Sequence, residues 1–176
     1  MNKFGPPGKP CLKKGFTLIE LLIVVAIIAI LAIIIIVAIN PGKMLAKSRD
    51  SQRFSDATSL ATAINLYLAD AKDFTGMVEQ EYKSTDGLSD NARKKNDGTG
   101  WIPIDFRTVT SGAPLASLPI DPVNNATYYY SFGLSVTDKT YEITCAFEHS
   151  DNTSKHASDG GTDANRYEVG TDLTVL

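Results

Sequence analysis

The 176-residue sequence predicts an α+β fold, in which a long amino-terminal transmembrane helix continues into a small carboxy-terminal domain with an antiparallel β-sheet. Three observations lead to this prediction. Residues 16–39 are apolar apart from one threonine and one glutamate, and residues 40–74 repeat apolar side chains at helical spacing. Further along, short segments alternate apolar and polar side chains, which is the period of a half-buried strand.

The apolar run is long enough to cross a membrane. Its 24 residues, 16–39, would span about 36 Å as a helix, against about 30 Å for the hydrocarbon core of a bilayer. A secretory signal peptide would have a shorter apolar region that ends in a cleavage site of small residues, so that interpretation is disfavoured. The flanking charges do not decide the orientation, because basic residues stand at both ends: Lys3, Lys9, Lys13 and Lys14 before the run, and Lys43, Lys47, Arg49 and Arg53 after it.

A second helical stretch follows the sequence Asn40-Pro41-Gly42, which locally weakens a helix. Residues 40–74 are therefore predicted to form the outer, amphipathic half of one long helix. Its polar face would carry Asp50, Gln52, Asp56, Asn65 and Asp70, and its apolar stripe Phe54, Ala57, Leu60, Ala61, Ile64, Tyr67, Leu68, Ala71 and Phe74.

The remaining residues, 75–176, are predicted to form the globular domain. Residues 75–100 are polar and lack a sustained period, which is typical of a surface connection. Trp101 is expected to anchor the core or its edge, and the turn-rich segment 114–122 to hold at most one helical turn. Strands are predicted at 127–132 and 141–148, joined by 133–139, with a last short strand at 167–170. The second strand places Cys145 on its apolar face as a small buried side chain.

The junction at the start of the apolar run carries a family resemblance. Lys13-Lys14-Gly15-Phe16-Thr17-Leu18-Ile19-Glu20, followed by the run, resembles the class III signal of type IV pilins and type II secretion pseudopilins. The resemblance implies that a prepilin peptidase cuts between Gly15 and Phe16 on the cytoplasmic side and N-methylates the new Phe16 amine. It also implies the pilin fold, and a role for Glu20, fifth in the mature chain, in the registration of subunits.

Glu20 is unusual on physical grounds as well. A carboxylate within a membrane span is costly and is by default a hypothesis about function. In a bundle of staggered helices, Glu20 of one chain can neutralise the Phe16 amine of its neighbour. Because both charges leave water, only the register that pairs them is favoured. We therefore expect Glu20→Ala to permit processing but to impair assembly.

Removal of residues 1–15 would change the charge and the cysteine content. The chain has 17 basic and 20 acidic residues, and loss of four lysines would shift its net charge from −3 to −7. Such an acidic surface disfavours nucleic acid as a partner, and the basic run 93–95 is interpreted as a solvated loop. Cys11 would be lost with the leader, so Cys145 would remain without an internal disulfide partner.

The resemblance also implies partners and a location. The partners are other pilin subunits, the prepilin peptidase, membrane lipid before assembly, and an inner-membrane platform with its assembly ATPase. The chain would first be a single-pass inner-membrane protein with a cytoplasmic amino terminus, and then part of a surface or periplasm-spanning filament. Leu118-Pro119-Ile120-Asp121-Pro122, closely followed by Tyr128-Tyr129-Tyr130, resembles a stretch of the G-type major pseudopilins.

Other classes of function remain open from the sequence. One alternative is a membrane-anchored, extracytoplasmic ligand-binding or sensory domain that does not polymerise. Another is a surface hydrolase that uses His149 or His156, although no nucleophile-elbow, phosphate-loop or zinc motif accompanies these residues. No catalytic residue and no cofactor are expected. Calcium is the one candidate ligand, because G-type pseudopilins hold calcium in a carboxy-terminal loop; hard oxygen ligands are offered here by Asp159, Asp163, Asn165 and Glu168.

Overall fold

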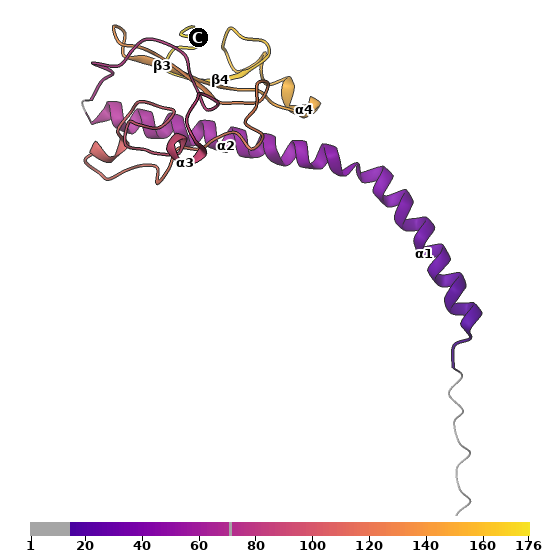
Figure 1. The fold of residues 1–176 in the computed structure, drawn as a ribbon. Coiled ribbons are helices and arrows are strands. Elements are labelled where there is room, and N and C mark those ends of the chain that lie inside the picture. The colour runs from indigo at the N-terminus through magenta and orange to yellow at the C-terminus, as the bar shows by residue number, and fades with distance from the viewer. Residues whose placement is uncertain (1–14, 71) are drawn as a thin grey trace, which may run out of the picture. The chain divides into compact units, whose positions relative to one another are not determined.

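The computed structural model describes residues 15–70 and 72–176, and the chain separates into two compact units, residues 1–41 and 42–176. Most of the expected leader, including Cys11, and Ala71 of the predicted stripe lie outside the described residues. Figure 1 shows the order of the elements along the chain. The α+β prediction is confirmed: a long apolar helix precedes a second helix and a small antiparallel sheet.

The first unit contains helix α1, Leu18–Ile39. Thr17 caps its start, because the Thr17 hydroxyl accepts a hydrogen bond from the Glu20 amide at 3.2 Å. Its end is set by Asn40, which adopts a left-handed conformation with φ of 48° and donates its backbone N–H to the Ile36 carbonyl. The predicted weakening of the long helix is therefore a full interruption, confined to the single residue Asn40.

Helix α2, Pro41–Ala69, begins with a proline, which suits the first position of a helix because that position needs no backbone donor. The predicted apolar stripe is largely confirmed, since Ala57, Leu60, Ala61 and Ile64 are buried and Ala63 joins them. Small side chains on this face let the sheet approach the helix closely. Two predictions were wrong at the start of the stripe: Phe54, expected to be buried, is 43% exposed, and Asp50, expected on the polar face, is buried. Arg53 is buried as well.

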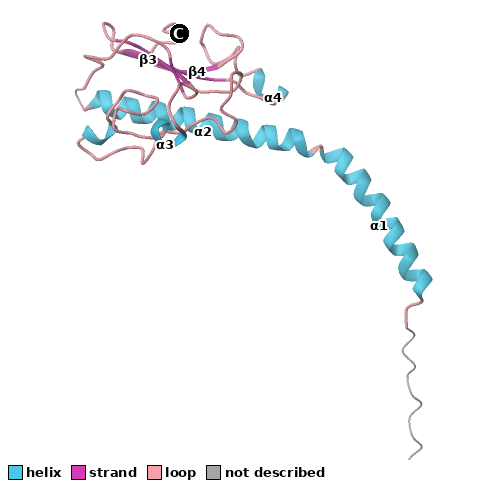
Figure 2. Cartoon of the chain, viewed as in Figure 1, coloured by secondary structure: helices cyan, strands magenta, loops and turns pink. Residues whose placement is uncertain are grey.

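The sheet has four antiparallel strands in sequence order: β1 Tyr82–Lys83, β2 Ser131–Ser135, β3 Thr140–Cys145 and β4 Tyr167–Gly170. Short helices interrupt the connections: α3 Asp90–Arg93, a 3-10 turn Phe106–Thr108 and α4 Ser150–Thr153. Loops form much of the rest of the domain (Figure 2). The strand predicted at 167–170 is confirmed with its bounds as β4.

The other predicted segments differ from the structure in their bounds, and the strand predicted at 141–148 spans Thr140–Cys145. Strand β2 begins at Ser131 and not at Thr127, because the Asn125 side chain accepts hydrogen bonds from the backbone N–H of Thr127 and of Tyr128 and holds that segment in a turn. Residues 133–135, expected in the connection, belong to β2. Strand β1 comes from the segment interpreted as a surface connection, and the helical turn lies at 106–108 and not within 114–122.

The hydrophobic core lies between α2 and one face of the sheet. From β3, Tyr141, Ile143 and Cys145 point into it, and the Tyr141 hydroxyl donates to the Ala61 carbonyl of α2 at 3.1 Å. Trp101 is buried as expected, with its indole N–H donated to the Pro119 carbonyl at 2.9 Å. The opposite face of β3 is also buried, although its residues are polar, and this second buried face was not predicted.

Candidate functional site

The junction between the expected leader and α1 is exposed and not helical, with an extended backbone at Thr17. Gly15, Phe16 and Thr17 have no helical structure, and the Phe16 side chain is 82% exposed. The helix starts one residue after Thr17, whose cap fixes this boundary. The bond between Gly15 and Phe16 therefore lies outside the helix.

Glu20 lies in the first turn of α1, where a negative charge faces the positive end of the helix dipole. Its side chain is exposed, and none of residues 15–70 and 72–176 forms an ion pair with its carboxylate. The positions of Phe16 and Glu20 within the chain are therefore compatible with a partner supplied by another molecule.

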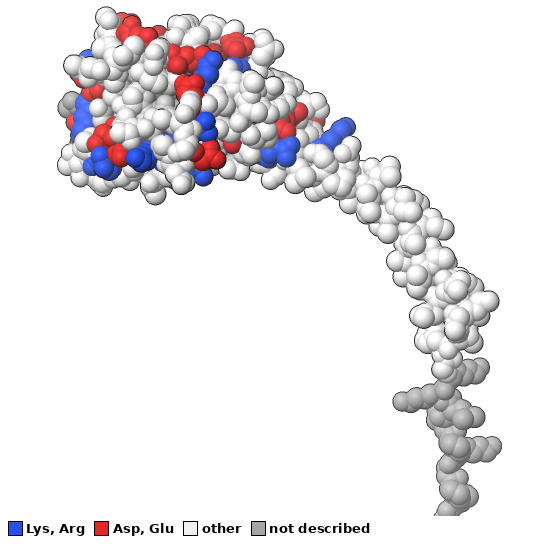
Figure 3. Space-filling view, in the orientation of Figure 1, with Lys and Arg blue, Asp and Glu red and all other residues white. Residues whose placement is uncertain are grey.

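Helix α1 is apolar on every side, and all of its residues are exposed. It is long and apolar enough to cross a membrane, by its length and composition. Figure 3 shows its visible face without charged side chains, whereas the visible face of the domain carries both signs of charge. An apolar surface of this length needs lipid or protein around it.

Comparison with known protein families gives the class of this segment. The model of the prokaryotic N-terminal methylation motif matches residues 12–36. This motif is the prepilin-type signal of type IV pilins and pseudopilins, and it supports a processed, pilin-like subunit.

The motif together with the apolar helix also fits membrane anchoring, processing by a prepilin peptidase and assembly with other pilins. Neither the search of curated proteins nor that of solved structures gave a match for this chain.

In the domain, a buried cluster of charges joins α2 to two loops. The Arg53 guanidinium, with no exposed surface, donates from Nε and Nη2 to the Asp121 carboxylate at 2.6 and 3.0 Å. Its Nη1 lies 3.0 Å from an Asp50 oxygen and 2.6 Å from a Glu148 oxygen. Burial alone would lower the pKa of Arg53, but its hydrogen bonds with Asp121 and Glu148 outweigh burial and raise the pKa. Arg49 also pairs with Glu148, and these contacts lower the pKa of that carboxyl.

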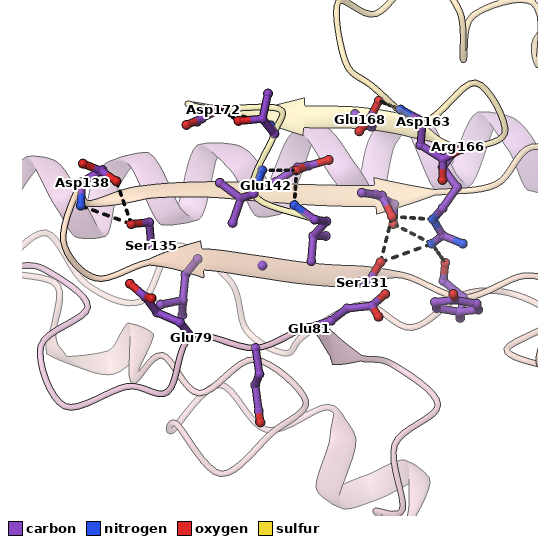
Figure 4. Close-up of a pocket in the computed structure, with 18 residues that line it drawn as sticks. Glu79, Glu81, Ser131, Ser135, Asp138, Glu142, Asp163, Arg166, Glu168 and Asp172 are labelled. Atoms are coloured by element: carbon purple, nitrogen blue, oxygen red, sulfur yellow. Dashed lines mark hydrogen bonds between the residues drawn. The ribbon is translucent and has the colours of Figure 1, made fainter.

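A groove of about 690 Å³ lies on the sheet face that points away from α2 (Figure 4). We call it the outer groove; seven of its lining residues are acidic, and Arg166 is the only basic residue among the described residues that line it. Arg166 donates to the Tyr129 carbonyl at 2.8 Å and also contacts Ser131 and Thr144. The charged residues of the outer groove are Glu79, Glu81, Asp138, Glu142, Asp163, Arg166, Glu168 and Asp172.

Three of the four calcium candidates, Asp159, Asp163 and Glu168, direct carboxylate oxygens at backbone N–H groups within the loop before β4 and at the start of that strand. Asp159 accepts from the amides of Gly161 and Glu168, and Glu168 accepts from the amide of Asp163 at 2.9 Å. Asp163 in turn accepts from the amide of Asn165. Among the described residues, no group of three or more histidine, cysteine or acidic side chains is arranged to hold a metal ion. These contacts give the loop an internal structure without an ion.

The side chains of the two histidines of the hydrolase alternative also accept hydrogen bonds from backbone N–H groups. His156 is buried and stacked on the Phe147 ring, and its Nε2 accepts the Phe147 N–H at 3.1 Å. Burial lowers the pKa of His156, which favours the neutral ring that can accept this bond. His149 accepts the Asp151 N–H through Nδ1 and caps α4. These contacts of both rings are those of structural residues.

Sequence reasoning missed the buried charge cluster and the buried polar face of the sheet. Arg53 lies among exposed polar residues in the sequence, and its partner Asp121 is 68 positions away. The alternation along β3 identified Glu142 as polar but could not indicate that residues 171–176 cover it. The available signal was weak: two glutamates at polar positions of segments that were both expected to be strands.

Proposed function

We propose that the chain is a structural subunit of a type IV pilus or a type II secretion pseudopilus. Residues 1–15 are its leader, and a prepilin peptidase cleaves between Gly15 and Phe16 and methylates the Phe16 amine. The observation that carries the proposal is the coincidence of the methylation motif at residues 12–36 with an exposed, non-helical junction and an uncovered apolar helix. The protein is then the substrate of an enzyme and not an enzyme itself.

Glu20 is the proposed registration residue. After cleavage it stands one helical turn from a new terminal amine, which is charged when protonated. A single carboxylate on an apolar helix is costly in lipid or in a protein bundle unless it is paired. The Phe16 amine of a neighbouring subunit supplies the opposite charge, so only one axial stagger satisfies both groups. The apolar faces of α1 then pack against each other in the filament core.

This assignment divides the chain by environment. Residues 16–39 lie first in the inner membrane and then in the filament core, and residues 40–74 lay their apolar stripe on the domain. Residues 75–176 form the extracytoplasmic part. The partners are other pilins, the membrane platform and the assembly ATPase that drives subunits out of the bilayer.

The test is mass spectrometry of the chain co-expressed with a prepilin peptidase. We expect a mature amino terminus at Phe16 that carries the additional mass of a methyl group. The Glu20→Gln variant should be processed like the wild type but give at least tenfold fewer filaments, because loss of one partner of a buried charge pair costs more than the roughly 1.4 kcal/mol that corresponds to tenfold. Asp90→Asn, which removes a carboxylate 73% exposed on α3, is the matched control and should assemble normally.

The alternative outcomes are distinct. A chain that keeps residues 1–15 and stays monomeric in lipid would favour the anchored ligand-binding or sensory domain. A processed chain whose Glu20→Gln variant assembles with the wild-type yield would retain the class of protein but remove the registration role of Glu20.

A further inference from the structure

The outer face of the sheet is closed by a segment that we call the strap, residues 171–176. The Glu142 side chain, which is fully buried, holds it: one oxygen, Oε2, accepts the backbone N–H of Val175 at 3.0 Å and that of Leu176 at 2.9 Å. The other oxygen, Oε1, is buried without a hydrogen-bond partner among the described residues. Figure 4 shows Glu142 on β3 with these two bonds, on the floor of the outer groove.

A second contact shows that the strap is built into the fold. Gly133 of β2 lies under the strap, and a Cβ atom placed there would come within 2.5 Å of a Leu176 methyl carbon and 3.2 Å of a Val175 methyl carbon. The absence of a side chain at Gly133 thus makes the space that Leu176 fills. At its other end the strap begins with Thr171, whose backbone N–H donates to the Tyr141 carbonyl and whose hydroxyl accepts the Tyr141 N–H.

The unsatisfied oxygen of Glu142 lies on the same sheet face as Glu168. In the register of β3 and β4, Glu142 opposes Gly170 and Thr144 opposes Glu168, so the two glutamates are diagonal neighbours. Burial, followed by the influence of the neighbouring Glu168 carboxyl, raises the pKa of Glu142 to about 7. The other charged groups around them come from the segment before β1, the β2–β3 turn, the loop before β4 and the strap: Glu79, Glu81, Asp138, Asp163, Arg166 and Asp172.

A proton resolves both difficulties of this arrangement. Two neighbouring buried carboxylates repel each other, and an unpaired buried oxygen costs free energy. If one proton is held between the two carboxyl groups, the repulsion disappears and the free Glu142 oxygen gains its partner. Oε2 remains available to accept both strap N–H groups.

We propose that the strap is a pH-sensitive closure of the outer groove, kept shut by a proton shared between Glu142 and Glu168. Loss of the proton leaves two adjacent negative charges beneath the strap, and the strap detaches. Its release uncovers Gly133 and the polar face of β3, which widens the acidic groove. This closure belongs to the domain and does not depend on the function proposed for α1.

Hydrogen–deuterium exchange of the full chain in detergent micelles tests the proposal. Exchange in peptides covering residues 171–176 is compared between wild type and Glu142→Gln at each pH, so that the intrinsic pH dependence cancels. The glutamine amide can donate to Glu168 while its oxygen accepts both strap N–H groups, which imitates the protonated state permanently. At pH 5 the two proteins should exchange alike. At pH 9, two units above the value of about 7, the wild-type strap should exchange roughly 100-fold faster than the variant.

A second variant and an internal control complete the test. Glu168→Gln removes the like charge, so the opening of its strap should shift to higher pH or vanish. Peptides from β2 and β3 should remain protected in all three proteins at pH 9. Equal exchange of the wild-type and Glu142→Gln straps at pH 9 would overturn the proposal, as would a simultaneous loss of protection throughout the sheet.

Discussion

The buried Arg53 gives the sharpest prediction about stability. Arg53→Met keeps an unbranched apolar side chain but removes the guanidinium that neutralises three carboxylates. Breaking a buried ion pair by removing one partner costs about 3–5 kcal/mol. The lower end applies here, because Asp121 keeps two backbone N–H donors, and Asp50 keeps two backbone donors and the Asn152 amide. We therefore expect a loss of about 3 kcal/mol, a large share of the roughly 5–15 kcal/mol that stabilises an ordinary domain.

The assay is urea unfolding of the full chain in detergent, followed by the fluorescence of Trp101. This indole contacts the Pro119 carbonyl, two residues from Asp121, so its emission reports on the loop that Arg53 holds. With a denaturant slope of about 1.5 kcal/mol per molar, the midpoint should fall by about 2 M. Arg107→Met is the control, because Arg107 pairs with Asp105 at the surface and its loss should leave the midpoint unchanged. Equal midpoints for the two variants would refute this account of the cluster.

Two further predictions concern titratable groups of the domain. Because burial lowers the pKa of His156 below the ordinary value of 6.5, the unfolded chain takes up the proton first, so the contribution of His156 is complete above pH 6.5 and is lost as the pH falls below it. The urea midpoint of the wild type should therefore fall more between pH 7.5 and pH 5 than that of His156→Gln; parallel curves would contradict this. Burial also raises the pKa of the Cys145 thiol to about 12, so in a Cys11→Ser background a maleimide should not label the native chain at pH 8 but should label it in urea. Rapid labelling of the native chain would show that the thiol is accessible.

Local patterns in the sequence predicted the parts of the fold that depend on local physics. The apolar run, the alanine-rich stripe of α2 and the strand 167–170 each follow from the spacing of neighbouring side chains. Strand β2 begins later than predicted. The tyrosine run favours strand structure, but the side-chain hydrogen bonds of Asn125 stabilise a turn at its start. Strand β1 has only two residues, too few to show a period.

The candidate sites also differ in whether residues close together in the sequence define them. The junction around Gly15, Phe16 and Glu20 is a contiguous motif, so the sequence alone was enough to locate it. The contacts of Arg53 with Asp121 and of Glu142 with the strap join residues far apart in the chain, and a single sequence contains no signal for such pairs. A buried charge also contradicts the usual link between polarity and exposure, which placed Asp50 on the solvent side.

The interruption at Asn40 has a consequence for how the chain can change surroundings. Asn40 interrupts the helical conformation of the backbone, because it is left-handed, and Pro41, the first residue of α2, has no N–H to donate. Unwinding of α1 would therefore stop at residue 40 and would not spread into α2. The domain and α2 can therefore keep their internal order when the surroundings of the apolar helix α1 change.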